Sequence, residues 1–139
     1  MRAVLDTNVV VSALLWGGTP ERLIQAAIDG ALELATSPAL IDELREVLAR
    51  PPLASRLTQE RMRAEQAVSL YARLATQVSP LAIEKIVTAD PDDDEVLACA
   101  IAARADLVVS GDRHLTALKT HRGIRILTPA QALDIVAGG

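Results

Sequence analysis

The sequence has almost no aromatic residues. Trp16 and Tyr71 are present, Phe is absent, and aromatic residues make up only 1% of the 139-residue chain. Because half of all residues are hydrophobic, a sizeable core is expected, built from Leu, Val, Ile and Ala. The same scarcity argues against base stacking on aromatic side chains as a way of binding nucleic acid.

Cysteine and long apolar runs are also scarce. The single cysteine, Cys99, excludes an internal disulfide, and no apolar run approaches the roughly 18 residues that span a bilayer. The first residues lead into a strand pattern without the features of a secretion signal. We therefore expect one soluble domain over residues 1–139, in the reducing cytoplasm and with no membrane contact.

An excess of positive charge is missing as well. Fourteen Lys and Arg face eighteen Asp and Glu, for a net charge of −4. This balance argues against a protein that holds nucleic acid by a general basic field. If the protein acts on a phosphodiester, a metal ion would have to help neutralise the substrate.

Short β-type runs alternate with longer helical patterns, which predicts β-α units and a mostly parallel sheet. Strands are expected at 3–5, at 31–36, from 106 to its end at Ser110-Gly111-Asp112, and at 124–127, with a further short strand before the acidic run. Helices are expected at 8–16, 19–30, 37–50, 58–75, 94–105 and from 128 to before 138. Thr19 is the expected N-cap of the second helix, and Pro51 and Pro52 should break the third.

Two aspartates follow predicted strands directly. Asp6 comes after "AVL" and Asp112 comes after "LVVSG". In an open parallel sheet, ligands bind outside the carboxyl ends of the strands, so both acids are candidate metal ligands. Taken singly, each is more often an ordinary turn residue, since Asp is favoured where strands end.

Glu43 lies early in the helix after the second strand. The helical period directs one apolar stripe to the core and turns Asp42 and Glu46 to solvent, with Glu43 at the margin. The stripe consists of Leu40, Ile41, Leu44, Val47 and Leu48. Glu43 is therefore either a ligand leaning toward a cleft or a solvated acid on a helix flank.

Five acids occur within six residues before the helix at 94–105, and they are Asp90, Asp92, Asp93, Asp94 and Glu95. One aspartate is explained by helix capping and the helix dipole. Five would repel one another unless a cation or solvent separates them, and Asp94 is the best candidate ligand.

The candidate acids converge on one edge, and oxygen ligands without a Cys or His cluster suit Mg²⁺ or Mn²⁺ rather than Zn²⁺. His114 and His121 are expected at the surface, and Cys99 in the core. No phosphate-binding GxxxxGK loop and no GxGxxG after the first strand is present, which discounts a nucleotide cofactor.

Nearly the whole chain resembles the PIN-domain family, in particular the VapC-like toxin ribonucleases of prokaryotic toxin-antitoxin pairs. The resemblance rests on "VLDTNVVVSAL", "SPALIDELREVLARP", "DPDDDEVLACAIAARADLVVSGDRHL" and "ILTPAQAL". The third stretch is the most specific, because acid, Ala-rich helix, strand and final Asp occur in the family's order and spacing.

The resemblance implies a three-layer α/β/α fold with a central, mostly parallel sheet, and an acidic pocket that binds one or two Mg²⁺ or Mn²⁺ ions for RNA cleavage. The implied catalytic and metal-binding residues are Asp6, Glu43, Asp94 and Asp112. The positions that support the pocket are Thr7, Asn8, Asp92, Asp93 and Ser110. It further implies an RNA substrate, a cognate antitoxin protein and a homodimer.

Other functions stay open at this point. A non-catalytic RNA-binding or protein-interaction module would keep the acids for a structural cation. A receiver-like signalling domain would need paired acids after its first strand, whereas this chain has the single Asp6 there. Arg22, Arg45, Arg50 and Arg113 are either phosphate contacts or solubilising surface residues.

Overall fold

The computed structural model describes residues 1–59, 63–80 and 91–138, and within these ranges it leaves the side chains at 58, 59 and 91–93 undescribed. The described strands form one sheet in the order β3-β2-β1-β4-β6-β5. Every neighbouring pair is parallel except β5 with β6. The strands are β1 (Arg2–Leu5), β2 (Glu33–Thr36), β3 (Thr76–Gln77), β4 (Leu107–Val109), β5 (Thr120–His121) and β6 (Ile124–Leu127).

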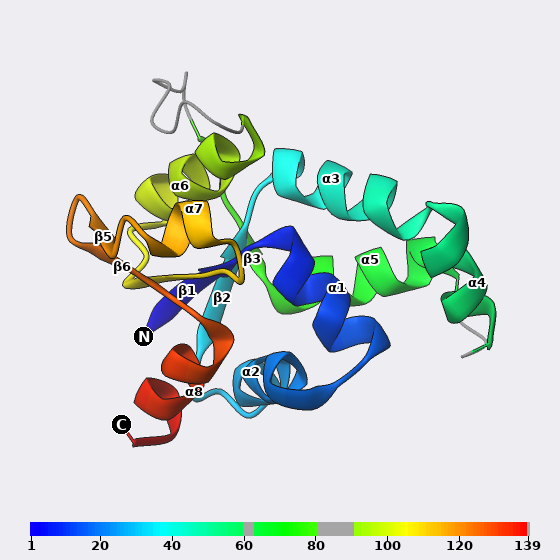
Figure 1. The fold of residues 1–139 in the computed structure, drawn as a ribbon, viewed down its shortest axis with the longest axis horizontal. Coiled ribbons are helices and arrows are strands. Elements are labelled where there is room, and N and C mark those ends of the chain that lie inside the picture. The colour runs from blue at the N-terminus through cyan, green and yellow to red at the C-terminus, as the bar shows by residue number, and fades with distance from the viewer. Residues whose placement is uncertain (60–62, 81–90, 139) are drawn as a thin grey trace.

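Helices cover both faces of this sheet (Figure 1). They are α1 (Thr7–Leu15), α2 (Gly18–Ile28), α3 (Pro38–Leu48), α4 (Pro51–Gln59), α5 (Ala64–Leu74), α6 (Pro91–Ala103), α7 (Arg113–Thr116) and α8 (Pro129–Gly138). None of the helices among the described residues is both long enough and apolar enough to cross a membrane.

The strands divide the core into two clusters. Ala3 and Leu5 pack on one face with residues from α1, α2, α3, α5 and α8, whereas Val4 packs on the other face with α6 and Leu115 of α7. This alternation follows from the two-residue period of a strand, and both faces are apolar, as expected for a parallel sheet between helices. The predicted three-layer α/β/α fold is confirmed.

The order of the strands creates a switch point beside β1. From β1 the chain adds β2 and β3 on one side, and then returns to add β4 and β6 on the other. Leu5 at the end of β1 is therefore in register with Val109 at the end of β4. The loops that leave these two strands diverge, and such a point is where open α/β sheets bind ligands.

Helix boundaries differ from the prediction in two places. The N-cap of α2 is Gly17 rather than Thr19, because Gly17 adopts a φ of 73° and allows the chain to reverse directly after α1. Pro51 and Pro52 do end α3, but Pro51 also begins α4, which the sequence analysis missed. Proline lacks an N–H and is accepted in the first turn of a helix, where that N–H has no partner.

The helix predicted from 58 to 75 is wrong as a single element. Thr58 and Gln59 belong to α4, and α5 begins at Ala64. Arg63 between them is extended, with φ −90° and ψ 151°, and its N–H donates to Oε1 of Gln66. The apolar period that predicted this helix continues through α5, so periodicity alone did not reveal the new start.

Short elements were also missed. The two-residue edge strands β3 and β5 and the four-residue helix α7 carry no periodic signal of their own. The short strand predicted before the acidic run falls largely on residues 81–90, which lie outside the described part of the chain.

Candidate functional site

Asp6 is the first residue after β1 and is 7% exposed. Its N–H donates to the Val109 carbonyl over 2.9 Å, and its own carbonyl accepts from Val9 and Val10 in the first turn of α1. Asp6 is thus the N-cap of α1 by position, yet its side chain makes no capping hydrogen bond. The turn interpretation therefore explains the backbone of Asp6, but not why its carboxylate is buried.

Ser110 holds the Asp6 carboxylate. The Ser110 hydroxyl is fully buried and donates to Oδ2 of Asp6 over 2.7 Å. The same hydroxyl accepts a hydrogen bond from the N–H of Asp112 over 3.0 Å. This short chain of hydrogen bonds couples the carboxyl end of β4 to that of β1, and the charged acceptor strengthens it.

Asp112 caps the short helix α7. Its Oδ1 accepts from the N–H of His114 over 2.8 Å, and its side chain is partly buried. The alternative kept in the sequence analysis, an ordinary turn residue, is therefore correct for Oδ1 of Asp112. Because Asp112 also donates its N–H to Ser110, it lies at the same edge of the sheet as Asp6.

Asp94 in the acidic run is buried, with an exposed fraction of 6%. Helix α6 leads into β4, so its first turn lies at the carboxyl edge of the parallel sheet and its last turn at the amino edge. Asp92 and Asp93 belong to the first turn of α6, but their side chains are not described. Asp90 lies outside the described residues.

Glu43 lies on α3 and is half-buried, as expected at the margin of the apolar stripe. All five residues of that stripe are buried, and Asp42 and Glu46 are exposed. Asp42 forms an ion pair with Arg45 at 3.0 Å, and Arg45 also binds Glu65 of α5 at 2.8 Å. Arg45 is therefore engaged in ion pairs on the exposed side of α3.

The supporting positions differ in burial. Thr7 is buried and Asn8 is exposed, although both follow Asp6 directly. Thr36 and Ser37 at the end of β2 are buried polar residues that the site prediction did not include. Ser37 caps α3 through a 3.4 Å bond from the Leu40 N–H. The sequence signal for Thr36 and Ser37 was their position as polar residues at the end of an apolar predicted strand.

The chemistry of these donors fits a hard divalent cation, since carboxylate and hydroxyl oxygens surround the switch point and two of the carboxylates are buried. Among the described side chains, no three from His, Cys, Asp and Glu form a group that could hold a metal ion.

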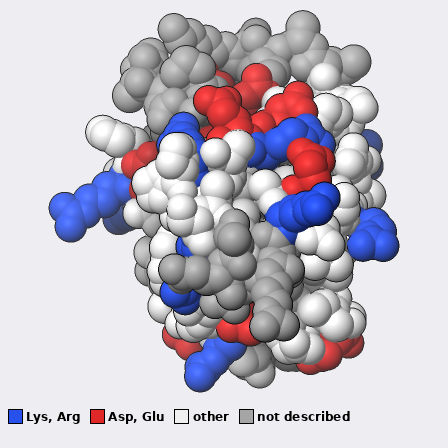
Figure 2. Space-filling view, turned by 90° about the vertical axis from the view of Figure 1, so that its right-hand side faces the viewer, with Lys and Arg blue, Asp and Glu red and all other residues white. Residues whose placement is uncertain are grey.

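Charge on the neighbouring surface is mixed. Figure 2 presents the face on the side of α3, α4 and α5, where acidic and basic side chains lie next to one another. The described side chains on this face form no continuous basic surface. Arg113, exposed and adjacent to Asp112, is the basic residue of the sequence prediction that lies beside the candidate site.

Cys99 is a core residue, as predicted. It is fully buried on α6, and this burial raises the pKa of its thiol to about 12, with a smaller opposing effect from the Ser37 hydroxyl. A thiol with a raised pKa is a poor nucleophile. His114 is exposed as expected, while His121 is half-buried and its Nε2 is enclosed.

Comparisons with known proteins show the family to which this chain belongs. A comparison with curated proteins finds no match. The chain is similar in fold to a chain of the crystal structure of VapBC2 from Rickettsia felis bound to a promoter DNA fragment, with a TM-score of 0.61 and 14% identity. The match covers 91% of this chain and 97% of the other. Residues 2–114 match the PIN domain by sequence, so this protein belongs to the PIN domain family.

Proposed function

We propose that this protein is a metal-dependent endoribonuclease and the toxin component of a toxin-antitoxin pair. PIN domains are generally metal-dependent nucleases, so membership of this chain in the PIN domain family supports metal-dependent cleavage of nucleic acid. The observation that carries the proposal is the buried Asp6 carboxylate at the switch point, held by the Ser110 hydroxyl rather than used as a helix cap.

The residues of the proposed site have distinct roles. One or two Mg²⁺ or Mn²⁺ ions would be held by Asp6, Glu43, Asp94 and Asp112. A bound ion would supply an activated water and charge neutralisation at the scissile phosphate. Ser110 fixes the orientation of Asp6, and Thr7, Asn8, Asp92 and Asp93 support the pocket.

Burial contributes to this role. Asp6 and Asp94 are only 7% and 6% exposed, so their carboxylates are shielded from bulk water and interact strongly with a cation. Glu43 and Asp112 are less buried and belong to α3 and the start of α7. From these positions Glu43 and Asp112 would complete the proposed set of ligands.

The proposed substrate is RNA, and the proposed partners are a cognate antitoxin and a second copy of this chain. The similarity in fold to a chain of a VapBC2 complex supports an antitoxin partner. A mixed surface charge and scarce aromatic residues suit recognition of RNA by backbone, shape and hydrogen bonds more than by base stacking.

A second candidate function is a non-catalytic RNA-binding or protein-interaction module that keeps the acids for a structural cation. It would hold the cation with the same acids but would not activate a water at a scissile phosphate. The two candidates differ in one measurable property, which is turnover of RNA in the presence of a divalent ion.

The test is cleavage of a mixed single-stranded RNA pool by purified protein with Mg²⁺, with Mn²⁺ and with a chelator. Asp6→Asn and the exposed control Asp134→Asn on α8 are assayed in parallel, with circular dichroism to check folding. The nuclease proposal expects cleavage that needs metal and Asp6 but not Asp134. RNA binding without cleavage by the folded wild type would favour the non-catalytic module.

A further inference from the structure

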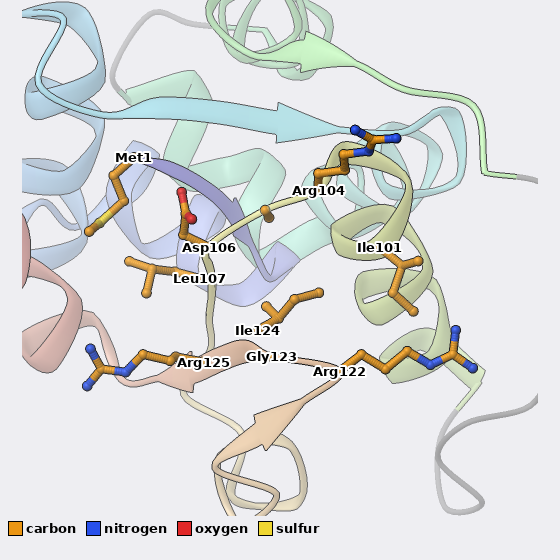
Figure 3. Close-up of a pocket in the computed structure, with 10 residues that line it drawn as sticks. Met1, Ile101, Arg104, Asp106, Leu107, Arg122, Gly123, Ile124 and Arg125 are labelled. Carbon is orange, nitrogen blue, oxygen red and sulfur yellow. The ribbon is translucent and has the colours of Figure 1, made fainter.

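A cavity of about 510 Å³ lies at the amino edge of the sheet, opposite the candidate active site. It is formed where the end of α6 leads into β4, where β6 begins after the β5–β6 turn, and beside Met1 (Figure 3). Its volume lies within the range of ordinary binding pockets. The proposed nuclease function makes no use of this cavity.

The cavity combines an apolar floor with a basic rim. Leu107 and Ile124 are buried residues that line it, together with Ile101 and Met1. The rim contributes three arginines and one acid, and these are Arg104, Arg122, Arg125 and Asp106. Oδ2 of Asp106 accepts a hydrogen bond from the Arg2 N–H over 2.9 Å. In a chain with a net charge of −4, the lining residues carry more positive than negative charge.

Two of these arginines occupy backbone positions that favour other residues. Arg104 follows α6 with a φ of 52°, and the bonds from Arg104 and Ala105 to the carbonyls of Ile101 and Ala100 form a Schellman-type end. Glycine is the usual residue at this position because a side chain is disfavoured at positive φ.

Arg122 also has a positive φ, which disfavours a residue with a side chain. Arg122 and Gly123, with φ of 50° and 80°, form the two-residue turn between His121 and Ile124. Asn-Gly is the favoured pair in such a turn. In the described chain the non-glycine residues at positive φ are Arg104, Lys119 and Arg122, all of them cations. Local preference is commonly broken where a side chain has a function.

We propose that this cavity docks a segment of a partner protein in which apolar residues are flanked by Asp or Glu. Apolar side chains of the segment would fill the floor, and its carboxylates would pair with Arg104 and Arg125, since arginine binds a carboxylate through two parallel hydrogen bonds. Arginine beside an apolar pocket is typical of the residues that dominate binding at protein interfaces.

The shape of the rim favours a peptide over other anions. In Figure 3 the side chains of Arg104, Arg122 and Arg125 extend to different sides of the cavity. Such an arrangement suits several spaced carboxylates rather than one compact phosphate. The lining contains no aromatic residue on which a nucleic acid base could stack.

The test uses a fluorescein-labelled peptide in which glutamate alternates with leucine, with fluorescence anisotropy as the readout. The comparison is between the wild type and the double variant Arg104→Gly, Arg125→Gln. The variant should bind about tenfold or more weakly, because two charge-assisted contacts are lost. Its thermal unfolding midpoint should be unchanged or higher, since glycine suits the positive φ at position 104 and Arg125 is exposed. Arg73→Gln, an exposed change on α5, is the matched control and should bind as the wild type.

Two further peptides and one oligonucleotide complete the test. A peptide with lysine in place of glutamate and one with serine in place of leucine should both bind more weakly. Equal binding of the lysine peptide, no binding of the glutamate peptide, or unchanged binding by the double variant would each overturn the proposal. Preferential binding of a labelled single-stranded RNA, lost in the double variant, would also overturn it and assign the cavity to nucleic acid. None of these outcomes depends on RNA cleavage.

Discussion

The Ser110 hydroxyl donates a 2.7 Å hydrogen bond to the Asp6 carboxylate, joining two residues 104 positions apart in the chain. Both residues are buried, and they follow β4 and β1, which are neighbours in the sheet. A buried carboxylate that accepts from a fixed hydroxyl has a defined orientation. This relationship makes the candidate active site sensitive to a residue that is not itself an acid.

Replacing Ser110 by Ala should destabilise the protein. The change removes both hydrogen bonds of a buried hydroxyl, the one donated to Asp6 and the one accepted from the Asp112 N–H, and a loss of this kind costs about 1–3 kcal/mol. Urea unfolding measures the loss of stability, and Ser69→Ala at an exposed position of α5 is the control. Equal stability of the two variants would contradict the structural role of Ser110.

Divalent metal should stabilise the wild type through the proposed acidic site. An ion that binds only the folded state at a concentration of a hundred times its Kd adds about 2.7 kcal/mol. The melting temperature should therefore rise with Mg²⁺ or Mn²⁺ in the wild type and rise less in Asp6→Asn. An identical rise in both proteins would place the stabilising ion elsewhere.

Alkaline pH should weaken the fold through Cys99. Burial raises the pKa of this thiol from 9.0 to about 12, so the folded protein holds the proton more tightly than the unfolded chain. The resulting stability is complete below pH 9 and is lost as the pH rises toward 12, with a slope of at most about 1.4 kcal/mol per pH unit. Denaturant titrations of the wild type and Cys99→Ala between these pH values measure it, and parallel curves would refute the assignment.

The two positive-φ positions Arg104 and Gly30 should respond in opposite directions. Arg104→Gly should raise stability by about 1 kcal/mol, because glycine adopts a φ of 52° without strain. Gly30→Ala should lower it by a similar amount, because alanine is strained at a φ of 83°. A methyl group at this position would meet no atom within 4 Å, so the loss would come from the backbone and not from a steric clash. Thermal unfolding of both variants tests whether the backbone alone accounts for the difference.

Tyr71→Phe should leave the protein as stable as the wild type or up to about 1 kcal/mol more stable. The Tyr71 hydroxyl is buried and has no hydrogen-bond partner in the described structure, so its removal ends an uncompensated desolvation cost. Equilibrium unfolding in urea measures the change. A clear loss of stability would indicate a partner for the hydroxyl, such as a buried water.

The elements that were predicted correctly have strong local signals. β1, β4 and β6 are short apolar runs, α3 has a Ser-Pro start and a clear apolar stripe, and α6 is apolar on nearly all sides. These patterns reflect burial on one or both faces, which the order of residues encodes directly. The same reasoning placed Glu43 correctly at the margin of its stripe.

The elements that were missed depend on their neighbours. β3 and β5 are two residues long and exist because a longer strand pairs with each of them. α7 has only four residues, and its cap is the same Asp112 that was considered as a metal ligand. No single-sequence pattern separates these outcomes, because a capping aspartate and a ligand aspartate both follow a strand.

By itself, the sequence determined the α/β class, the alternation of elements and the position of Asp6 and Asp112 after strands, because these follow from local periodicity and turn chemistry. The return of the chain to place β4 beside β1 was decided only by the tertiary structure. That return brings Ser110 to Asp6 at the carboxyl edge and gathers Arg104, Arg122 and Arg125 at the amino edge. Contacts between residues so far apart in the chain depend on which strands pair, and pairing is settled by the packing of the whole core rather than by any local stretch.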